Sequence, residues 1–385
     1  MRIRLLTVSG AATLALLSAL VLPAGAGAQS PTLSLFGKWT STVTAALPTG
    51  DGSVMQLVTT NTDTYVLMSD GTVWSYGDDT FGELGNGTVA HTWTTTPTPV
   101  DFTLPPGVVI TQLATVGPNA TELAIDSQHD VWGWGLNSFG QLCLGNESVQ
   151  PSPVQLPFTN VQQAIGAGSH ASYYTKTGTT QALYSCGGND NGQLGNGTFT
   201  SSLSPVPVSD LPNESIAFLT AAWNNMGAVM ADGTFWVWGY NAYGELGNDS
   251  TTDSPVPVEV PLQAPVAEAA QGGGGPTDGQ TLVVLTDQTT WAWGNDSWGQ
   301  LCLGTVTSTI KRPHEVSGSW TAVASGGTTQ YLKNANGRLW ACGDDSQNQF
   351  GDGGSSTVQS LPVRTPFKGV DQFSSTNFNA AALTG

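Results

Sequence analysis

A motif that recurs about every fifty residues is the feature that most constrains this 385-residue chain. Each copy has an aromatic stretch closed by a glycine, then a polar loop ending in Gly-Gln-Leu or a close variant, as in VWSYGDDTFGELGNGT from Val73. The closing glycines are separated by 58, 52, 52, 55 and 49 residues and are Gly77, Gly135, Gly187, Gly239, Gly294 and Gly343. A fixed period of this size predicts an array of supersecondary units.

A proline-rich stretch keeps the same rhythm and gives each unit its fourth strand. These stretches end at Val100, Val154, Val208, Val258, Val316 and Val363. Within the first unit we expect short strands at 54–60, 65–68, 72–76 and 97–100, with Asp70-Gly71 as a hairpin turn. Proline suits an outer edge strand, where its missing N–H costs nothing. Repeated four-stranded antiparallel units, with no helical periodicity after the first residues, predict an all-β β-propeller.

The two ends of the chain predict how this array closes. Residues 370–385 match only the opening half of a unit, and residues 33–43, with Phe36 and Trp39, are expected to supply the missing strands. A blade shared by both termini would leave no open edge between the first and last blades. We therefore expect a seven-bladed β-propeller of about fifty-residue four-stranded repeats. Six blades are the alternative, because the N-terminal stretch lacks a good copy of the motif.

The N-terminal segment has the pattern of a secretory signal peptide. Arg2 and Arg4 precede a largely apolar run at 5–22, and Ala26-Gly27-Ala28 fits a small-residue cleavage site. We expect a signal peptide at 1–28 and a single β-propeller domain at 29–385, secreted to the extracellular space and not attached to a membrane after cleavage. An uncleaved membrane anchor is the alternative.

The charge balance limits the classes of partner. The chain has 10 Lys+Arg against 28 Asp+Glu, a formal net charge of −18. A nucleic-acid binder neutralises phosphates with clustered cations, so we expect no nucleic-acid partner. We expect a monomer without a cofactor.

Four cysteines fall at two pairs of repeat-equivalent positions. Cys143 and Cys302 lie in the sequence Gln-Leu-Cys-Leu-Gly, where we interpret the spacing between motif glycines as lengthened by two residues. Cys186 and Cys342 take the place of an aromatic residue before the closing glycine, one unit further on. Repeat equivalence favours disulfides Cys143–Cys186 and Cys302–Cys342 between adjacent blades. The other connectivities, and four buried thiols, remain alternatives.

One aromatic loop position is the candidate binding site. Phe81, Phe139, Tyr243 and Trp298 all stand just before a glycine in the polar loop. If the loops are exposed, these residues form an aromatic ring on one face, as expected of an interface hot spot. The alternative is that they cover the neighbouring blade. We assign no catalytic residue, because no nucleophile elbow, zinc helix or phosphate loop occurs, and no metal ligand, although calcium binding by acidic loops stays open.

The repeat, with its DG-x-x-W-x-W-G-x-N-x-x-G-Q-L-G spacing, resembles the regulator of chromosome condensation repeat over nearly all of the chain after residue 28. The resemblance implies a seven-bladed propeller that binds protein. The family's founder exchanges nucleotide on a nuclear GTPase and contacts chromatin, which fits poorly with an export signal and a strongly acidic chain. The setting is more similar to that of propeller-type β-lactamase inhibitor proteins secreted by bacteria.

Two functional hypotheses follow. The first is a non-enzymatic scaffold that binds a protein partner through the face carrying the polar loops, with inhibition of a secreted enzyme as one form of that action. The alternative is a secreted or cell-wall-associated enzyme acting on polysaccharide. The alternative requires two adjacent carboxylates with a raised pKa in one pocket.

Overall fold

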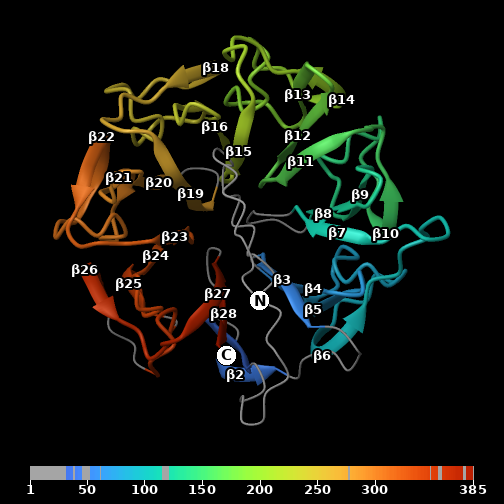
Figure 1. The fold of residues 1–385 in the computed structure, drawn as a ribbon, viewed down its shortest axis with the longest axis horizontal. Helices are drawn as coiled ribbons and strands as arrows, with labels where there is room; N and C mark the ends of the chain where they lie inside the picture. Colours follow the sequence, from blue (N-terminus) through green and yellow to red (C-terminus); the bar gives the residue numbers. More distant parts are fainter. Residues whose placement is uncertain are drawn as a thin grey trace, which may run out of the picture.

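The computed structural model describes residues 32–37, 40–45, 53–60, 62–114, 121–275, 278–346, 348–353, 358–375 and 379–384. Within these ranges every regular element is a strand, and the strands form small sheets arranged around a ring (Figure 1). No helix in this part of the chain is long and apolar enough to cross a membrane. The expected signal peptide at 1–28 and Trp39 lie outside the described residues.

Six blades are each built from one continuous segment and consist of four antiparallel strands. Blade 1 contains β3 (Val54–Thr59), β4 (Asp63–Met68), β5 (Val73–Asp78) and β6 (Trp93–Pro99). Blade 2 contains β7 (Ile110–Leu113), β8 (Thr121–Asp126), β9 (Val131–Gly135) and β10 (Gln150–Gln155). Blade 3 contains β11 (Val161–Gly166), β12 (His170–Thr177), β13 (Thr180–Gly187) and β14 (Ser202–Pro207).

The second half of the ring repeats this order. Blade 4 contains β15 (Ile216–Ala221), β16 (Asn225–Met230), β17 (Phe235–Gly239) and β18 (Ser254–Glu259). Blade 5 contains β19 (Val266–Gly275), β20 (Asp278–Leu285), β21 (Thr290–Asp296) and β22 (Thr307–Val316). Blade 6 contains β23 (Ala322–Ser325), β24 (Thr329–Lys333), β25 (Leu339–Gly343) and β26 (Gln359–Arg364). The prediction of an all-β propeller of four-stranded units is confirmed.

The two ends of the described chain meet in one further sheet, which we call the terminal sheet. It pairs β1 (Thr32–Gly37) and β2 (Thr40–Ala45) with β27 (Val370–Ser375) and β28 (Asn379–Thr384), in the order β2-β1-β28-β27. The expectation that both ends share a sheet is therefore confirmed. β27 contacts β3 of blade 1 and β23 of blade 6.

A glutamine side chain forms the same kind of contact at several sheet boundaries. In blade 1, the Gln56 side chain donates to the Leu113 carbonyl and accepts from the Leu113 N–H of blade 2. In the terminal sheet, the Gln372 side chain accepts from the Leu57 N–H and donates to the Met55 carbonyl of blade 1. The terminal sheet thus contacts blade 1 as blade 1 contacts blade 2.

The hydrophobic core lies between neighbouring blades. One buried cluster joins Leu123 and Val131 of blade 2 to Val161 and Tyr173 of blade 3. The second strands are the most buried; every residue of β4, β8 and β16 is buried, whereas β6 at the rim is mostly exposed or half-buried. This gradient explains why apolar side chains fill the middle strands and proline and threonine the fourth.

The glycine that closes each aromatic strand is required by a close backbone approach. Gly77 has φ +126°, and a Cβ there would lie 2.2 Å from the Thr62 carbonyl oxygen. Only glycine fits both this conformation and this space. The period of the motif glycines is therefore the period of the blades.

Candidate functional site

The loops between the third and fourth strands form one face of the ring, which we call the loop face. It comprises residues 79–92, 136–149, 188–201, 240–253, 297–306 and the described part of 344–358. Because every blade has the same strand order, these loops all emerge on the same side.

A buried side chain holds each aromatic loop position in place. The Phe81 N–H donates to Glu83 Oε2 at 2.6 Å, and the Tyr243 N–H donates to Glu245 Oε2 at 2.8 Å. Gln141 and Gln300 play this role in blades 2 and 5, accepting the N–H groups of Phe139 and Trp298 at 3.0 and 2.8 Å. The buried Gln or Glu side chain of the motif therefore fixes the loop backbone at the aromatic residue through a hydrogen bond.

The structure exposes three of the four aromatic residues expected to bind a partner. Phe81, Phe139 and Trp298 are 42%, 45% and 46% exposed. Tyr243 is half-buried, and its ring centroid lies 6.4 Å from that of Tyr240 in its own loop. The four residues come from blades 1, 2, 4 and 5, so they are distributed around the loop face rather than gathered in one place.

Several further apolar residues are exposed on the same face and were missed by the sequence reasoning. Among the described residues, seven of the nine exposed large hydrophobic side chains lie in these loops or begin the strand that follows. They are Phe81, Val89, Trp93, Phe139, Phe199, Trp298 and Val306. Val89, Phe199 and Val306 share one repeat position, twelve residues after the closing glycine and directly after Gly-Thr, whereas Trp93 does not. An apolar residue that recurs after Gly-Thr is the signal that could have found these three. This concentration is typical of a protein-binding surface.

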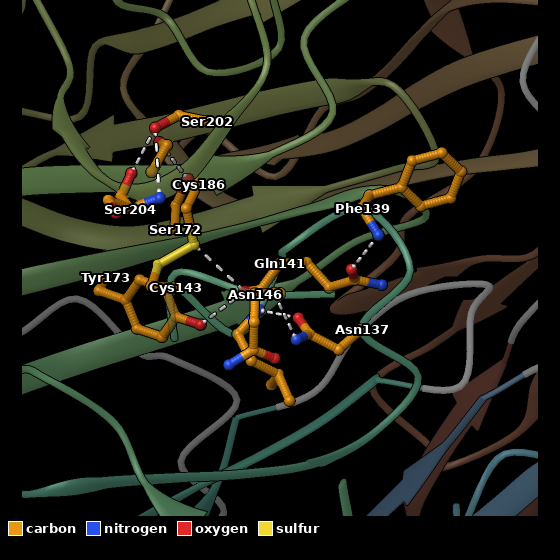
Figure 2. Close-up of a disulfide and its surroundings, with 12 residues drawn as sticks. Asn137, Phe139, Gln141, Cys143, Asn146, Ser172, Tyr173, Cys186, Ser202 and Ser204 are labelled. Atoms are coloured by element: carbon orange, nitrogen blue, oxygen red, sulfur yellow. Dashed lines mark hydrogen bonds between the residues drawn. A yellow bond between two sulfur atoms is a disulfide. The ribbon is translucent and has the colours of Figure 1, made fainter. Parts of the chain in front are cut away.

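Two disulfides join adjacent blades beneath this face, with the predicted pairing. Cys143–Cys186 links blade 2 to blade 3 (Figure 2), and Cys302–Cys342 links blade 5 to blade 6. The Cα atoms of each pair are 5.6 Å apart. Both pairings expected from repeat equivalence are confirmed.

The interpretation of the cysteine loops as lengthened is wrong. The Cys143 N–H donates to the Gly140 carbonyl, as the Gly85 N–H donates to the Gly82 carbonyl. Cys143 has φ 58° and Gly85 has φ 65°, so both adopt the same left-handed conformation. The cysteine therefore replaces the motif glycine in a loop of unchanged length.

The residue of the next blade that faces this loop position changes together with it. At the loops of blades 1, 3 and 4, which keep their glycine, a buried tryptophan of the next blade donates its indole N–H to the backbone carbonyl of the motif Gln or Glu. These bonds are Trp134 to Glu83 at 2.9 Å, Trp238 to Gln193 at 2.9 Å and Trp293 to Glu245 at 2.8 Å. At the cysteine loops, Cys186 and Cys342 occupy the tryptophan position.

Buried carboxyl groups lie at the base of the loop face in blades 1 and 2. Asp63, Glu83 and Glu122 are each at most 2% exposed. Burial raises the pKa of Glu83 to about 7. Burial, together with the charge of Glu83, raises the pKa of Asp63 well above its usual range. Asp63 and Glu83 have the raised pKa that the enzyme hypothesis requires, but their burial closes them to a substrate. Among the described residues, no group of three or more His, Cys, Asp or Glu side chains could hold a metal ion.

Comparison with known proteins identifies the repeat. Residues 128–173, 182–223 and 232–275 match the regulator of chromosome condensation (RCC1) repeat. The chain is 26% identical over 253 residues to the ultraviolet-B receptor UVR8 of Arabidopsis thaliana, covering 65% of this chain and 55% of the receptor. It is 26% identical over 263 residues to the human E3 ubiquitin-protein ligase HERC2, covering 66% of this chain and 5% of the ligase. The match thus spans about half of the receptor and a small part of the ligase.

Two solved structures have the same fold. Human WBSCR16 is 19% identical with a TM-score of 0.77, covering 92% of this chain and 99% of that protein. Prp20p of Saccharomyces cerevisiae, described together with its binding to Gsp1p and histones, is 16% identical with a TM-score of 0.76, covering 92% of this chain and 91% of that protein. At these identities the likeness is one of architecture.

Proposed function

The chain belongs to the RCC1 repeat family, and we propose that it is a secreted, non-enzymatic scaffold that binds a protein partner through its loop face. The observation that carries this proposal is the concentration of exposed apolar side chains on that face. Large apolar and aromatic side chains supply most of the binding energy of protein interfaces.

Secretion is supported by two independent features. The N-terminal residues have the pattern of a signal peptide, and all four cysteines are paired in disulfides, which persist in oxidising compartments. In such a compartment a monomeric scaffold could act by inhibiting a secreted enzyme.

The partner's chemistry follows from charge. The chain has a formal net charge of −18, so we expect a partner whose apolar contact residues lie within a basic or mixed-charge surface. We expect no nucleic-acid partner, for the same reason. Prp20p, which shares the fold, is described as binding Gsp1p and histones, and this precedent supports a protein as the partner class.

We further propose that the terminal sheet serves as a seventh blade and closes the ring. The contact of Gln372 with blade 1, which matches that of Gln56 with blade 2, supports this role. A closed ring would hold the loops at fixed spacing. Deleting residues 29–45 should then lower the thermal midpoint of the whole propeller, whereas an independent terminal sheet would leave that midpoint unchanged.

Affinity capture with matched variants tests the binding proposal. Residues 29–385 are immobilised, extracellular and surface proteins of the source organism are passed over them, and retained proteins are identified by mass. We expect one protein retained at near-equal stoichiometry and lost from the variant with Phe81, Phe139 and Trp298 changed to Ala. The control changes Val109 and Leu361 to Ala, which are exposed outside the loops. Equal retention by the triple variant would place the interface elsewhere, and no retained protein would overturn the proposal.

A further inference from the structure

Blade 6 carries a cavity with an exclusively positive charge, at the face opposite the loop face. The cavity has a volume of about 620 Å³ and lies between the β24–β25 turn and the segment that follows β26. Arg338, Arg364 and Lys368 line it, and none of its lining residues is Asp or Glu. These are three of only 10 Lys+Arg in a chain with 28 Asp+Glu, so their convergence runs against the charge of the whole molecule.

The equivalent turn of blade 2 is the comparison for this cavity, because there a carboxylate occupies the first position of the turn. There the Asp126 N–H donates to the Asp130 carbonyl, and Asp126 Oδ1 accepts the backbone N–H groups of Gln128 and Asp130. The second oxygen, Oδ2, accepts the indole N–H of Trp132 at 2.9 Å. The Asp126 carboxylate therefore accepts hydrogen bonds both from the backbone of the turn and from the tryptophan indole.

Blade 6 repeats this turn with neutral and positive residues. The Asn334 N–H donates to the Arg338 carbonyl, and Asn334 Oδ1 accepts the N–H groups of Asn336 and Arg338. Asn334 and Arg338 thus occupy the places of the two aspartates of blade 2. Since Asn334 uses its oxygen on the backbone, its amide nitrogen takes the place of the second carboxylate oxygen.

The tryptophan beside this turn consequently lacks its acceptor. Trp340, which lines the cavity, has a buried indole N–H with no hydrogen-bond partner in the described part of the chain. Where Trp occupies this position in blades 1, 4 and 5, its N–H donates to a threonine hydroxyl two residues earlier. In blade 6 that residue is Arg338, which offers no acceptor.

The paired residue on the outer strand has also changed charge. Arg364 stands opposite Trp340, and its guanidinium carbon lies 5.1 Å from the indole centroid. In blades 4 and 5 the residues opposite the equivalent tryptophans are Glu259 and Glu315. Both the turn and the outer strand therefore have inverted charge at the same cavity.

We infer that this cavity binds a small molecule through an oxyanion group, which takes the position that the Asp126 carboxylate holds in blade 2. A carboxylate, phosphate or sulfate would accept the indole N–H that has lost its internal acceptor and pair with Arg338 and Arg364, whose planar guanidinium groups suit oxyanions. The volume falls within the range of small-molecule sites and leaves room for a body about the size of a sugar.

Isothermal titration of the folded chain tests this site with inorganic phosphate, sulfate, glucuronate, glucose 6-phosphate and glucose. We expect the four anions to bind and glucose not to bind, with affinity falling as salt rises. Tighter binding of glucose 6-phosphate than of phosphate would show that a sugar body contributes; the reverse would identify the site as one for a free oxyanion. No binding by any anion at millimolar concentration would overturn the inference.

Two variants locate the binding. R364E should weaken it at least about tenfold. The control K176E makes the same charge change at an exposed lysine near the end of β12 in blade 3, on the same face, and should change the affinity less than about twofold. If both variants lose affinity equally, the anion is held by nonspecific electrostatic attraction and the proposal of a specific site is wrong.

The indole N–H gives a readout that charge alone would not change. In a nitrogen-15 spectrum the Trp340 indole signal should shift on addition of the best-binding anion. N334D, which restores the internal acceptor of blade 2, should shift this signal without any ligand and weaken binding, with an unchanged melting temperature. If the chemical shift of the Trp340 indole is unchanged both on addition of the anion and in N334D, the proposed geometry is wrong.

Discussion

Blade 3 joins blade 4 through a glycine and a tryptophan, whereas blade 2 joins blade 3 through two cysteines. At the first boundary a Cβ on Gly195 would lie 2.7 Å from Trp238 Nε1, so the large indole requires a glycine opposite it. At the second, Cys143 and Cys186 take the same two positions and are covalently linked. The two residues change together because they share one space.

This difference gives one ring two kinds of boundary with different sensitivities. The tryptophan boundaries depend on burial and one hydrogen bond, which are independent of the redox state. The disulfide boundaries depend on an oxidising compartment. They occur after blades 2 and 5, whereas the boundaries after blades 1, 3 and 4 are of the tryptophan kind.

Breaking a tryptophan boundary should have the largest effect. Trp238→Ala removes a fully buried indole and leaves the Gln193 carbonyl without that donor. We expect the free energy of unfolding to fall by about 3–5 kcal/mol, measured by urea denaturation. Trp236→Ala, at a half-buried position in the same strand, is the control and should cost less. A similar loss for both variants would contradict the special role of the boundary.

Each disulfide taken singly should have the next largest effect. Their cysteines are 43 and 40 residues apart, and each bond is worth about 3–4 kcal/mol in the chain-entropy model. Reductant should lower the thermal midpoint of the wild type and leave that of a variant with all four cysteines changed to Ala unchanged. Thiol labelling of the unfolded, unreduced protein should find no free thiol; four free thiols would disprove the pairing.

Acidity should affect the tryptophan boundary after blade 1, where the motif residue is Glu83 rather than Gln. Burial, and to a smaller extent the charges of Asp78 and Asp79, raise the pKa of Glu83 from 4.5 to about 7. Between these pH values the folded chain keeps a proton that the unfolded chain has lost, so the free energy of unfolding falls as pH rises and levels off above about pH 7.

Glu83→Gln should therefore flatten this slope and stabilise the protein at pH 8 by up to about 3 kcal/mol. Denaturant curves from pH 4 to pH 8 measure this slope. The slope that remains is assigned to the other carboxyls whose pKa burial raises, Asp63 and Glu268 among them. Gln141→Glu is the matched variant at a disulfide boundary and should steepen the slope. A steeper slope in Glu83→Gln would contradict the raised pKa.

Exchanging one kind of boundary for the other should have the smallest net effect. Gly195 has φ 65°, close to the 58° of Cys143, so the double variant with Gly195 and Trp238 changed to Cys should form a third disulfide. The lost indole and the gained cross-link are of similar size, so we expect a net change of about 1 kcal/mol in the oxidised protein. Alkylation of the unfolded protein before and after reduction, followed by mass measurement, detects the bond. Two alkylated thiols without reductant would show that the boundaries are not interchangeable.

Much of the fold could be predicted from particular residues. The closing glycines gave the blade period because a close backbone approach excludes any Cβ there. The cysteine pairing followed because repeat-equivalent residues of adjacent blades meet at equivalent places. The loop around Cys143 was misinterpreted, since counting between glycines treats a substituted glycine as an insertion.

The candidate sites were less accessible to sequence reasoning. The repeat position of Phe81, Phe139 and Trp298 pointed to the loop face, but exposure depends on how a loop lies over its neighbours, as half-buried Tyr243 shows. Arg338 and Arg364 are 26 positions apart in the chain, and nothing in their local sequence indicates that they line one cavity.

The sequence by itself determined what is repeated: the four-stranded unit, its period and the two boundaries that cysteine pairs join. These are local or periodic properties, set by backbone conformation and by side-chain alternation along a strand. Only the tertiary structure decided which side chains stay exposed and which hydrogen-bond donors lose their acceptors. Those outcomes depend on contacts between strands that the chain brings together from different positions, and such contacts leave no local pattern in the sequence.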